Sequence, residues 1–122
     1  MPANLEGITE SDVLVSAGAT ATGTYTITNE RASRLVVILN TVTASGGNTV
    51  QVTINGVTNQ GYVYPILVGV AVAAVAVTPY RVGPALTASA NAVSNDIVPR
   101  TVQIVVTVVG TVSYGIDYVL GT

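Results

Sequence analysis

The sequence contains no cysteine, no histidine and no lysine, and each absence excludes a kind of chemistry. Without histidine, Ser-His-Asp and Cys-His catalytic arrangements cannot form, and zinc sites built on histidine or cysteine are excluded as well. The phosphate-binding loop G-x-x-x-x-G-K-[ST] requires a lysine, and disulfides require cysteine. We therefore predict that the protein is not an enzyme and that it holds no cofactor.

Carboxylates are the remaining candidates for catalysis or metal binding. Asp96 and Asp117 could in principle converge as a glycosidase pair, but Asp96 follows Asn95 in a polar loop, where such side chains cap turns. Asp117 lies in an alternating, strand-like segment. A calcium site made of Asn95, Asp96 and backbone carbonyls is a second alternative, because Ca²⁺ needs only oxygen ligands. We predict no catalytic site and no metal site.

Charge is also scarce. Four arginines and six carboxylates make up 8% of the chain, against about a quarter in an ordinary domain. The net charge of −2 and the scattered arginines argue against nucleic-acid binding, which depends on clustered cations at the phosphates. Neutral hydroxyls and amides cost less to bury than charges. This composition favours a protein that lies against other subunits, and a neutral-surfaced monomer is the alternative.

Valine and threonine are abundant, with 24 and 17 copies in 122 residues. Such β-branched side chains favour sheets over helices, and the length suits a single domain. Seven to eight short strand-like segments alternate with turn residues, and no helical period is sustained. The fold class predicted is all-β: an antiparallel β-sandwich, jelly-roll or Ig-like, over residues 12–122. The predicted strands are 13–15, 24–28, 35–44, 50–54, 62–67, 76–82, 101–109 and 112–120. Two turns, Asn55-Gly56 and Asn59–Gly61, compete to close one hairpin.

Residues 1–11 are predicted to form an extended N-terminal arm. Leu5 and Ile8 are its apolar side chains, with which it could dock on the domain or on a neighbouring subunit; a frayed terminus is the equal alternative. The first residues have neither a basic region nor an apolar run, so we expect no signal peptide.

The segment from 61 to 77 carries no charge and is rich in valine. It is too short for a membrane-spanning helix and contains a proline, so we predict sheet core and no membrane association. Val68, Val70 and Val72 share one phase of alternation, and the valines from position 75 onward share the other, which indicates a bulge or a tight connection. The run could also be a strand shared between subunits.

Four of the six tyrosines form two pairs at strand spacing. Tyr62 and Tyr64 share one face of a predicted strand, as do Tyr114 and Tyr118 on another. A platform for stacking sugars or for contacting protein is one interpretation. We favour ordinary core residues with hydroxyls at the rim.

Arg81 and Arg100 each border an apolar segment. Arginine is the cation most common at protein interfaces, so each could pair with Asp96, with Asp117 or with a neighbouring subunit. A solvated charge at a strand end is the equal alternative.

Residues 50–120 resemble small structural proteins of tailed bacteriophages. The segments that carry the resemblance are Tyr62 to Leu67, Arg81-Val82-Gly83-Pro84-Ala85-Leu86-Thr87, Asn95-Asp96-Ile97-Val98-Pro99-Arg100-Thr101, and a strand that begins near Ser113-Tyr114. The resemblance implies a virion component made in the host cytoplasm, and a capsid decoration (cement) protein is the preferred role. Its partners would then be the major capsid protein or other virion proteins.

We expect such a protein to be a homo-oligomer, a trimer or pentamer, because avidity multiplies individually weak contacts. A neck or tail protein, or a β-sandwich module that binds carbohydrate or a host surface, is the alternative. The residues predicted to form interfaces are Leu5, Ile8, Tyr62, Tyr64, Val70, Val72, Arg81 and Arg100.

Overall fold

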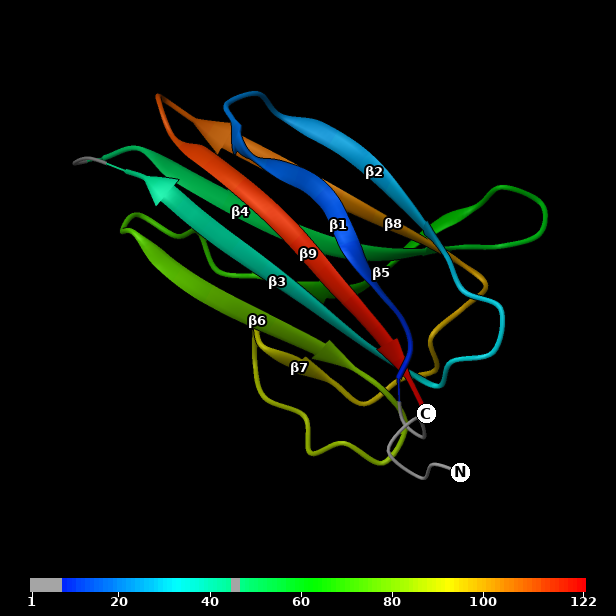
Figure 1. Ribbon diagram of the computed structural model, residues 1–122. Helices are drawn as coiled ribbons and strands as arrows, with labels where there is room; N and C mark the ends of the chain where they lie inside the picture. The colour runs from blue at the N-terminus through cyan, green and yellow to red at the C-terminus, as the bar shows by residue number, and fades with distance from the viewer. Residues whose placement is uncertain (1–7, 45–46) are drawn as a thin grey trace.

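The computed structural model describes residues 8–44 and 47–122 and shows two packed β-sheets (Figure 1). The nine strands in this part of the chain are β1 (Ile8–Ala19), β2 (Gly23–Thr28), β3 (Arg34–Thr43), β4 (Thr49–Val57), β5 (Val63–Val68), β6 (Ala76–Val82), β7 (Val93–Ser94), β8 (Thr101–Val109) and β9 (Ser113–Gly121). The prediction of an all-β sandwich is confirmed.

The strand order distinguishes between the two predicted topologies. One sheet has the order β1-β9-β3-β6-β7 and the other β2-β8-β4-β5. The hairpin β4–β5 is nested inside the pair β3–β6, then β2–β8, then β1–β9, and successive pairs lie in alternate sheets. All pairs are antiparallel except the two-residue pair β6–β7. This nesting is the jelly-roll arrangement, not the Ig-like one.

The core follows from strict alternation along the central strands. In β4 and β8 every second residue is buried, and Ile54 lies directly opposite Ile104 in the ladder. Leu35, Val37 and Leu39 of β3 face them from the other sheet and are fully buried. Each such side chain stabilises the fold by about 1.5–3 kcal/mol relative to exposure.

The last four residues of the predicted N-terminal arm belong to the sheet instead. Residues 8–11 belong to β1, whose backbone pairs with β9 from Ile8 opposite Gly121 to Asp12 opposite Tyr118. The sequence did not indicate this part of the strand because its residues are mostly polar, which is typical of an edge strand. Leu5 lies outside the described residues.

The hairpin between β4 and β5 closes at the second of the two candidate turns. Thr58 donates its backbone N–H to Tyr62 O at 2.8 Å, and its carbonyl accepts from Gly61 N at 2.9 Å. Gly61 has φ +89°, a conformation that favours glycine. Asn55-Gly56 continues β4 instead, because Gly56 is buried beneath the ring of Tyr64 on the neighbouring strand.

The valine-rich run is mostly surface, so the prediction of sheet core is wrong for most of it. Residues 69–75 connect β5 in one sheet to β6 in the other. Val72 pairs with Val50 through two backbone hydrogen bonds, but Val75 and Val77 are 65% and 68% exposed. The expected connection between two strands is present, and its apolar side chains face outward.

Asn29 ties two loops together at one end of the sandwich. Its buried side-chain amide donates to Ala32 O at 2.9 Å, to Val98 O at 3.3 Å and to Pro99 O at 3.4 Å. Its Oδ1 accepts from Ala32 N at 2.8 Å, and its backbone N–H donates to Arg100 O at 2.7 Å. The β2–β3 turn is thereby joined to the loop before β8.

We predict that Asn29→Ala lowers the free energy of unfolding by about 2 kcal/mol or more, because buried carbonyl and N–H groups lose their partner. Urea unfolding followed by circular dichroism measures the change. Asn59→Ala, in the exposed β4–β5 turn, is the matched control and should change stability little. Equal effects of the two substitutions would contradict this role of Asn29.

Candidate functional site

Among the described residues, the charged side chains lie at one end of the sandwich, apart from Asp12 and Asp117, which lie on neighbouring strands in the five-stranded sheet. No charge occurs in residues 13–29, 35–80 or 101–116. The connections β1–β2, β3–β4, β5–β6 and β8–β9 all lie at one end, as the register of the strands requires and as Figure 1 shows. These four connections carry no charged residue, and we call them, with the strand ends beside them, the neutral end.

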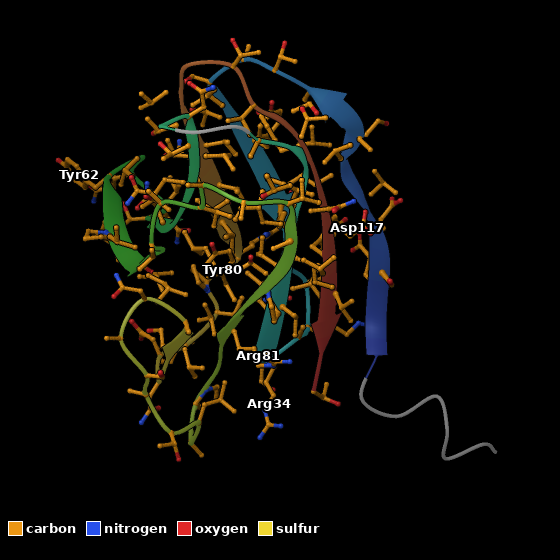
Figure 2. The ribbon with its side chains drawn as sticks, turned by 90° about the vertical axis from the view of Figure 1, so that its left-hand side faces the viewer. Arg34, Tyr62, Tyr80, Arg81 and Asp117 are labelled. Atoms are coloured by element: carbon orange, nitrogen blue, oxygen red, sulfur yellow. The ribbon has the colours of Figure 1, made fainter. Side chains whose placement is uncertain are left out.

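The opposite end, here the charged end, carries all four arginines. Arg34 begins β3 and Arg81 lies near the last residue of β6, and Figure 2 shows both at the same end. Arg31 lies in the β2–β3 turn, and Arg100 directly precedes β8. All four are exposed. Asp117 lies nearer the middle of β9, opposite Ile38.

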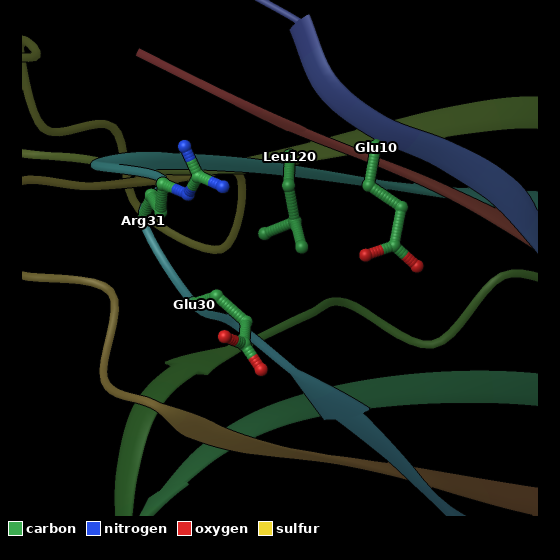
Figure 3. Close-up of a pocket in the computed structure, with 4 residues that line it drawn as sticks. All are labelled: Glu10, Glu30, Arg31 and Leu120. Carbon is green, nitrogen blue, oxygen red and sulfur yellow. The ribbon is translucent and has the colours of Figure 1, made fainter.

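A hollow at the charged end is lined by Glu10, Glu30, Arg31 and Leu120 (Figure 3). It is open to solvent, and its charged side chains are exposed. Glu10 is held on one side, because its carboxylate accepts a hydrogen bond from the Tyr118 hydroxyl. Within the described residues, no group of three or more acidic side chains is placed to hold a metal ion. The hollow thus offers two carboxylates and one guanidinium, all exposed to solvent.

Three core tyrosines have raised pKa values, and for Tyr80 burial is the cause. The hydrogen bond that Tyr118 donates to Glu10, together with burial and the nearby carboxylates of Glu10 and Asp12, raises the pKa of Tyr118 to about 12. Burial, with the hydroxyl of Tyr25 nearby, raises the pKa of Tyr114. The Tyr114 hydroxyl donates to Ala21 O at 2.6 Å and lies 3.1 Å from that of Tyr25, which links the two sheets.

The outer face of the four-stranded sheet is uncharged throughout. Threonines of β2 line its edge, and next to them lie the outward residues of β8 and β4. On β8, Gln103 lies between Thr26 of β2 and Asn55 of β4, and its Oε1 accepts from Asn55 Nδ2 at 3.4 Å. Hydroxyls, amides and methyl groups make up this face, so a partner could cover it without desolvating a charge.

The four tyrosines of the predicted platform do not form one surface. Tyr62 is 68% exposed and Tyr64 37% exposed, both on the edge strand β5 or directly before it. The expectation that these two are core residues is therefore wrong. For Tyr114 and Tyr118, which are buried on β9, it is confirmed.

The other predicted interface residues differ in their surroundings. Val70 is exposed, and Val72 is half-buried against the core. Of Ile8, the structure describes only the backbone pairing in β1. Across the described part of the chain, no ion pair joins Arg81 or Arg100 to an aspartate, so both remain candidates for contacts with solvent or a partner.

The side chains of Asn95 and Asp96 both bind backbone N–H groups of loops. Asn95 Oδ1 accepts from Ala85 N at 3.1 Å, which joins the loop before β8 to the β6–β7 loop, and Asp96 Oδ1 accepts from Ile97 N at 2.8 Å. Only the contact of Asp96 is local, as is typical of such side chains in turns. Asp117 belongs to a different strand, and nothing in the structure brings it together with Asp96.

Sequence reasoning missed two features of the site. The sequence contains the three long uncharged segments given above, but only the pairing of the strands shows that the turns within these segments lie together at one end of the sandwich. The contact between Glu10 and Tyr118 links the first and last strands and had no local signal.

No protein-family model, curated protein or solved structure matches the chain. Among the described residues there is no helix long and apolar enough to cross a membrane.

Between pH 10 and about pH 12 we predict that the protein loses stability as the pH rises. Tyrosines of the unfolded chain ionise near pH 10, whereas Tyr118 in the folded protein keeps its proton up to its pKa of about 12. The unfolded state therefore binds fewer protons, and the free energy of unfolding falls with pH.

Tyr118→Phe should reduce this slope by about one proton per molecule, measured by urea unfolding at a series of pH values. Tyr62→Phe, at an exposed position, is the control and should leave the slope unchanged. A slope unaffected by Tyr118→Phe would contradict the assignment.

Proposed function

We propose that this chain is a structural protein of a tailed-phage virion, which forms oligomers and binds and stabilises the head shell. The observation that carries the proposal is the combination of a jelly roll with an uncharged outer face on the four-stranded sheet and an uncharged end. Such a surface is suited to being covered, because desolvating hydroxyls and amides costs less than desolvating ions.

Two further observations support it. Jelly rolls are recurrent in viral capsid domains, which is an argument by analogy of fold. Three segments resemble those of phage structural proteins. Residues 62–67 cover most of β5, residues 81–87 the end of β6 and the start of the loop after it, and residues 95–101 the loop before β8. The partner would be the major capsid protein or another virion protein, and the site of action the virion.

The outer face of the four-stranded sheet is the surface that fits the shell. It is uncharged, and Gln103 lies on it between Thr26 and Asn55 of the neighbouring strands. Copies joined in an oligomer would present several such faces at once, so that individually weak contacts give stable attachment.

Cosedimentation with emptied head shells tests this function. We expect the purified protein to pellet with the shells and to raise their melting temperature in calorimetry. Gln103→Glu adds one charge of nearly the same shape to the proposed contact face and should weaken binding about tenfold, since an unpaired charge would be covered. Gln60→Glu, in the exposed β4–β5 turn, is the control. If the wild-type protein pelleted with no shell, the proposed function would be contradicted. If the two variants bound equally well, the proposed contact face would be contradicted.

A carbohydrate- or host-surface-binding module is the second candidate, and the exposure of Tyr62 beside Tyr64 favours it. Exposed aromatic rings offer flat apolar surface to a partner. Here we expect a glycan-array signal that Tyr62→Ala removes and Val63→Ala, at the neighbouring exposed position, retains. A blank array would exclude this alternative.

A further inference from the structure

We infer that the neutral end is the surface through which copies of this chain contact one another. The inference deepens the proposed function, which requires oligomers, but it can be tested without a shell. The surface consists of the β5–β6 connection and the strand ends beside it, with Val42, Val70, Val75, Val77 and Val109 exposed.

The exposed valines are gathered by the strand pairing. Val42 and Val75 each lie one residue beyond the Thr41–Ala76 pair of β3 and β6, and Val77 lies opposite Asn40 on the same sheet. Rigid, β-branched side chains lose little conformational freedom when they are covered. Monomeric proteins seldom leave apolar side chains contiguous in this way unless they form a contact.

The charge distribution favours a second copy as the occupant. Two neutral ends can meet without burying a charge, and their charged ends then lie far apart on opposite sides of the contact. A strongly charged partner would gain nothing from this surface and would lose hydration. Two neutral ends that face each other in this way form an isologous contact, which joins two copies about a two-fold axis.

The side chains of the neutral end also argue against other occupants. Proteins that lie on membranes use lysine or arginine with tryptophan or other large apolar side chains, whereas the described connections of this end carry small residues and valine. Contacts with unrelated proteins are enriched in tyrosine, tryptophan and arginine, and contacts in homodimers are more apolar. The neutral end matches the homodimer type.

The contact is made by side chains and does not extend a sheet. Pro79 lies in β6, where β7 pairs only with Arg81 and Val82, and Pro65 lies in the edge strand β5. A proline on an edge removes a hydrogen-bond donor and hinders pairing with another strand. Because two neutral ends that meet cover each other, association through this end gives a closed dimer and not a fibre.

Sedimentation velocity over a range of protein concentrations tests the inference. We expect the wild-type protein to be an oligomer, and Val77→Asp to raise its dissociation constant at least about tenfold, because each copy would bring a charge into the contact. Val75→Asp is a second variant with the same expected effect. Both positions are largely exposed, so the monomers should keep the fold, which circular dichroism and thermal unfolding can check.

Val63→Asp is the matched control. Val63 is 51% exposed and pairs with Val57 at the other end of β5, away from the neutral end. Its substitution should leave the oligomer intact. Wild-type protein that stays monomeric, or an oligomer that both Val75→Asp and Val77→Asp leave unchanged, would overturn the inference.

Two further measurements keep this inference separate from the proposed function. Wild-type oligomers that ignore every head shell would contradict the shell-binding function and leave the self-contact supported. Monomeric protein that binds shells would contradict the self-contact and leave the shell-binding function supported. Pelleting of the wild-type protein with neutral phosphatidylcholine vesicles, lost in Val77→Asp, would assign the neutral end to a membrane and overturn the inference.

Discussion

The sandwich depends on the hairpin formed by β8 and β9, because its two strands occupy central positions in different sheets. β8 lies between β2 and β4, and β9 lies between β1 and β3. The two edge strands β1 and β2 therefore obtain their only ladder partner from the last fifth of the chain, and β3 and β4 obtain one of their two partners from it. The inward residues of the hairpin, such as Ile104, Tyr114 and Ile116, are fully buried between the sheets. Such non-local pairing is entropically costly, because the chain loses the conformational entropy of a long loop before the strand contacts that offset this loss can form.

The same alternation that builds the core determines the chemistry of the surface. Every second residue of a central strand faces outward, and in a chain with so few charges these positions are filled by threonine, glutamine, asparagine and valine. Of the charges in the described residues, all but Asp12 and Asp117 fall at strand ends and loops on one side. Composition and topology together therefore produce a molecule with two chemically different ends, and neither alone would do so.

Sequence patterns predicted the strands that are bounded by proline or glycine and have regular alternation. The predicted bounds 76–82 and 101–109 are those of β6 and β8. Patterns failed where tertiary contacts decide: the start of β1 is polar because it is an edge, and Gly56 stays in β4 because Tyr64 covers it. The choice between jelly-roll and Ig-like order depends on pairing between distant segments, which no local signal encodes. For the same reason the sequence indicated individual interface candidates but not the two ends.

The placement of the first and last strands has a practical consequence. β1 begins opposite the end of β9, so Ile8 and the C-terminal Thr122 both lie at the charged end (Figure 1). A peptide or domain fused after Thr122 would project from the side opposite the neutral end. If copies assemble through their neutral ends, each would display its cargo outward, and the assembly would serve as a multivalent scaffold without engineering of its contacts.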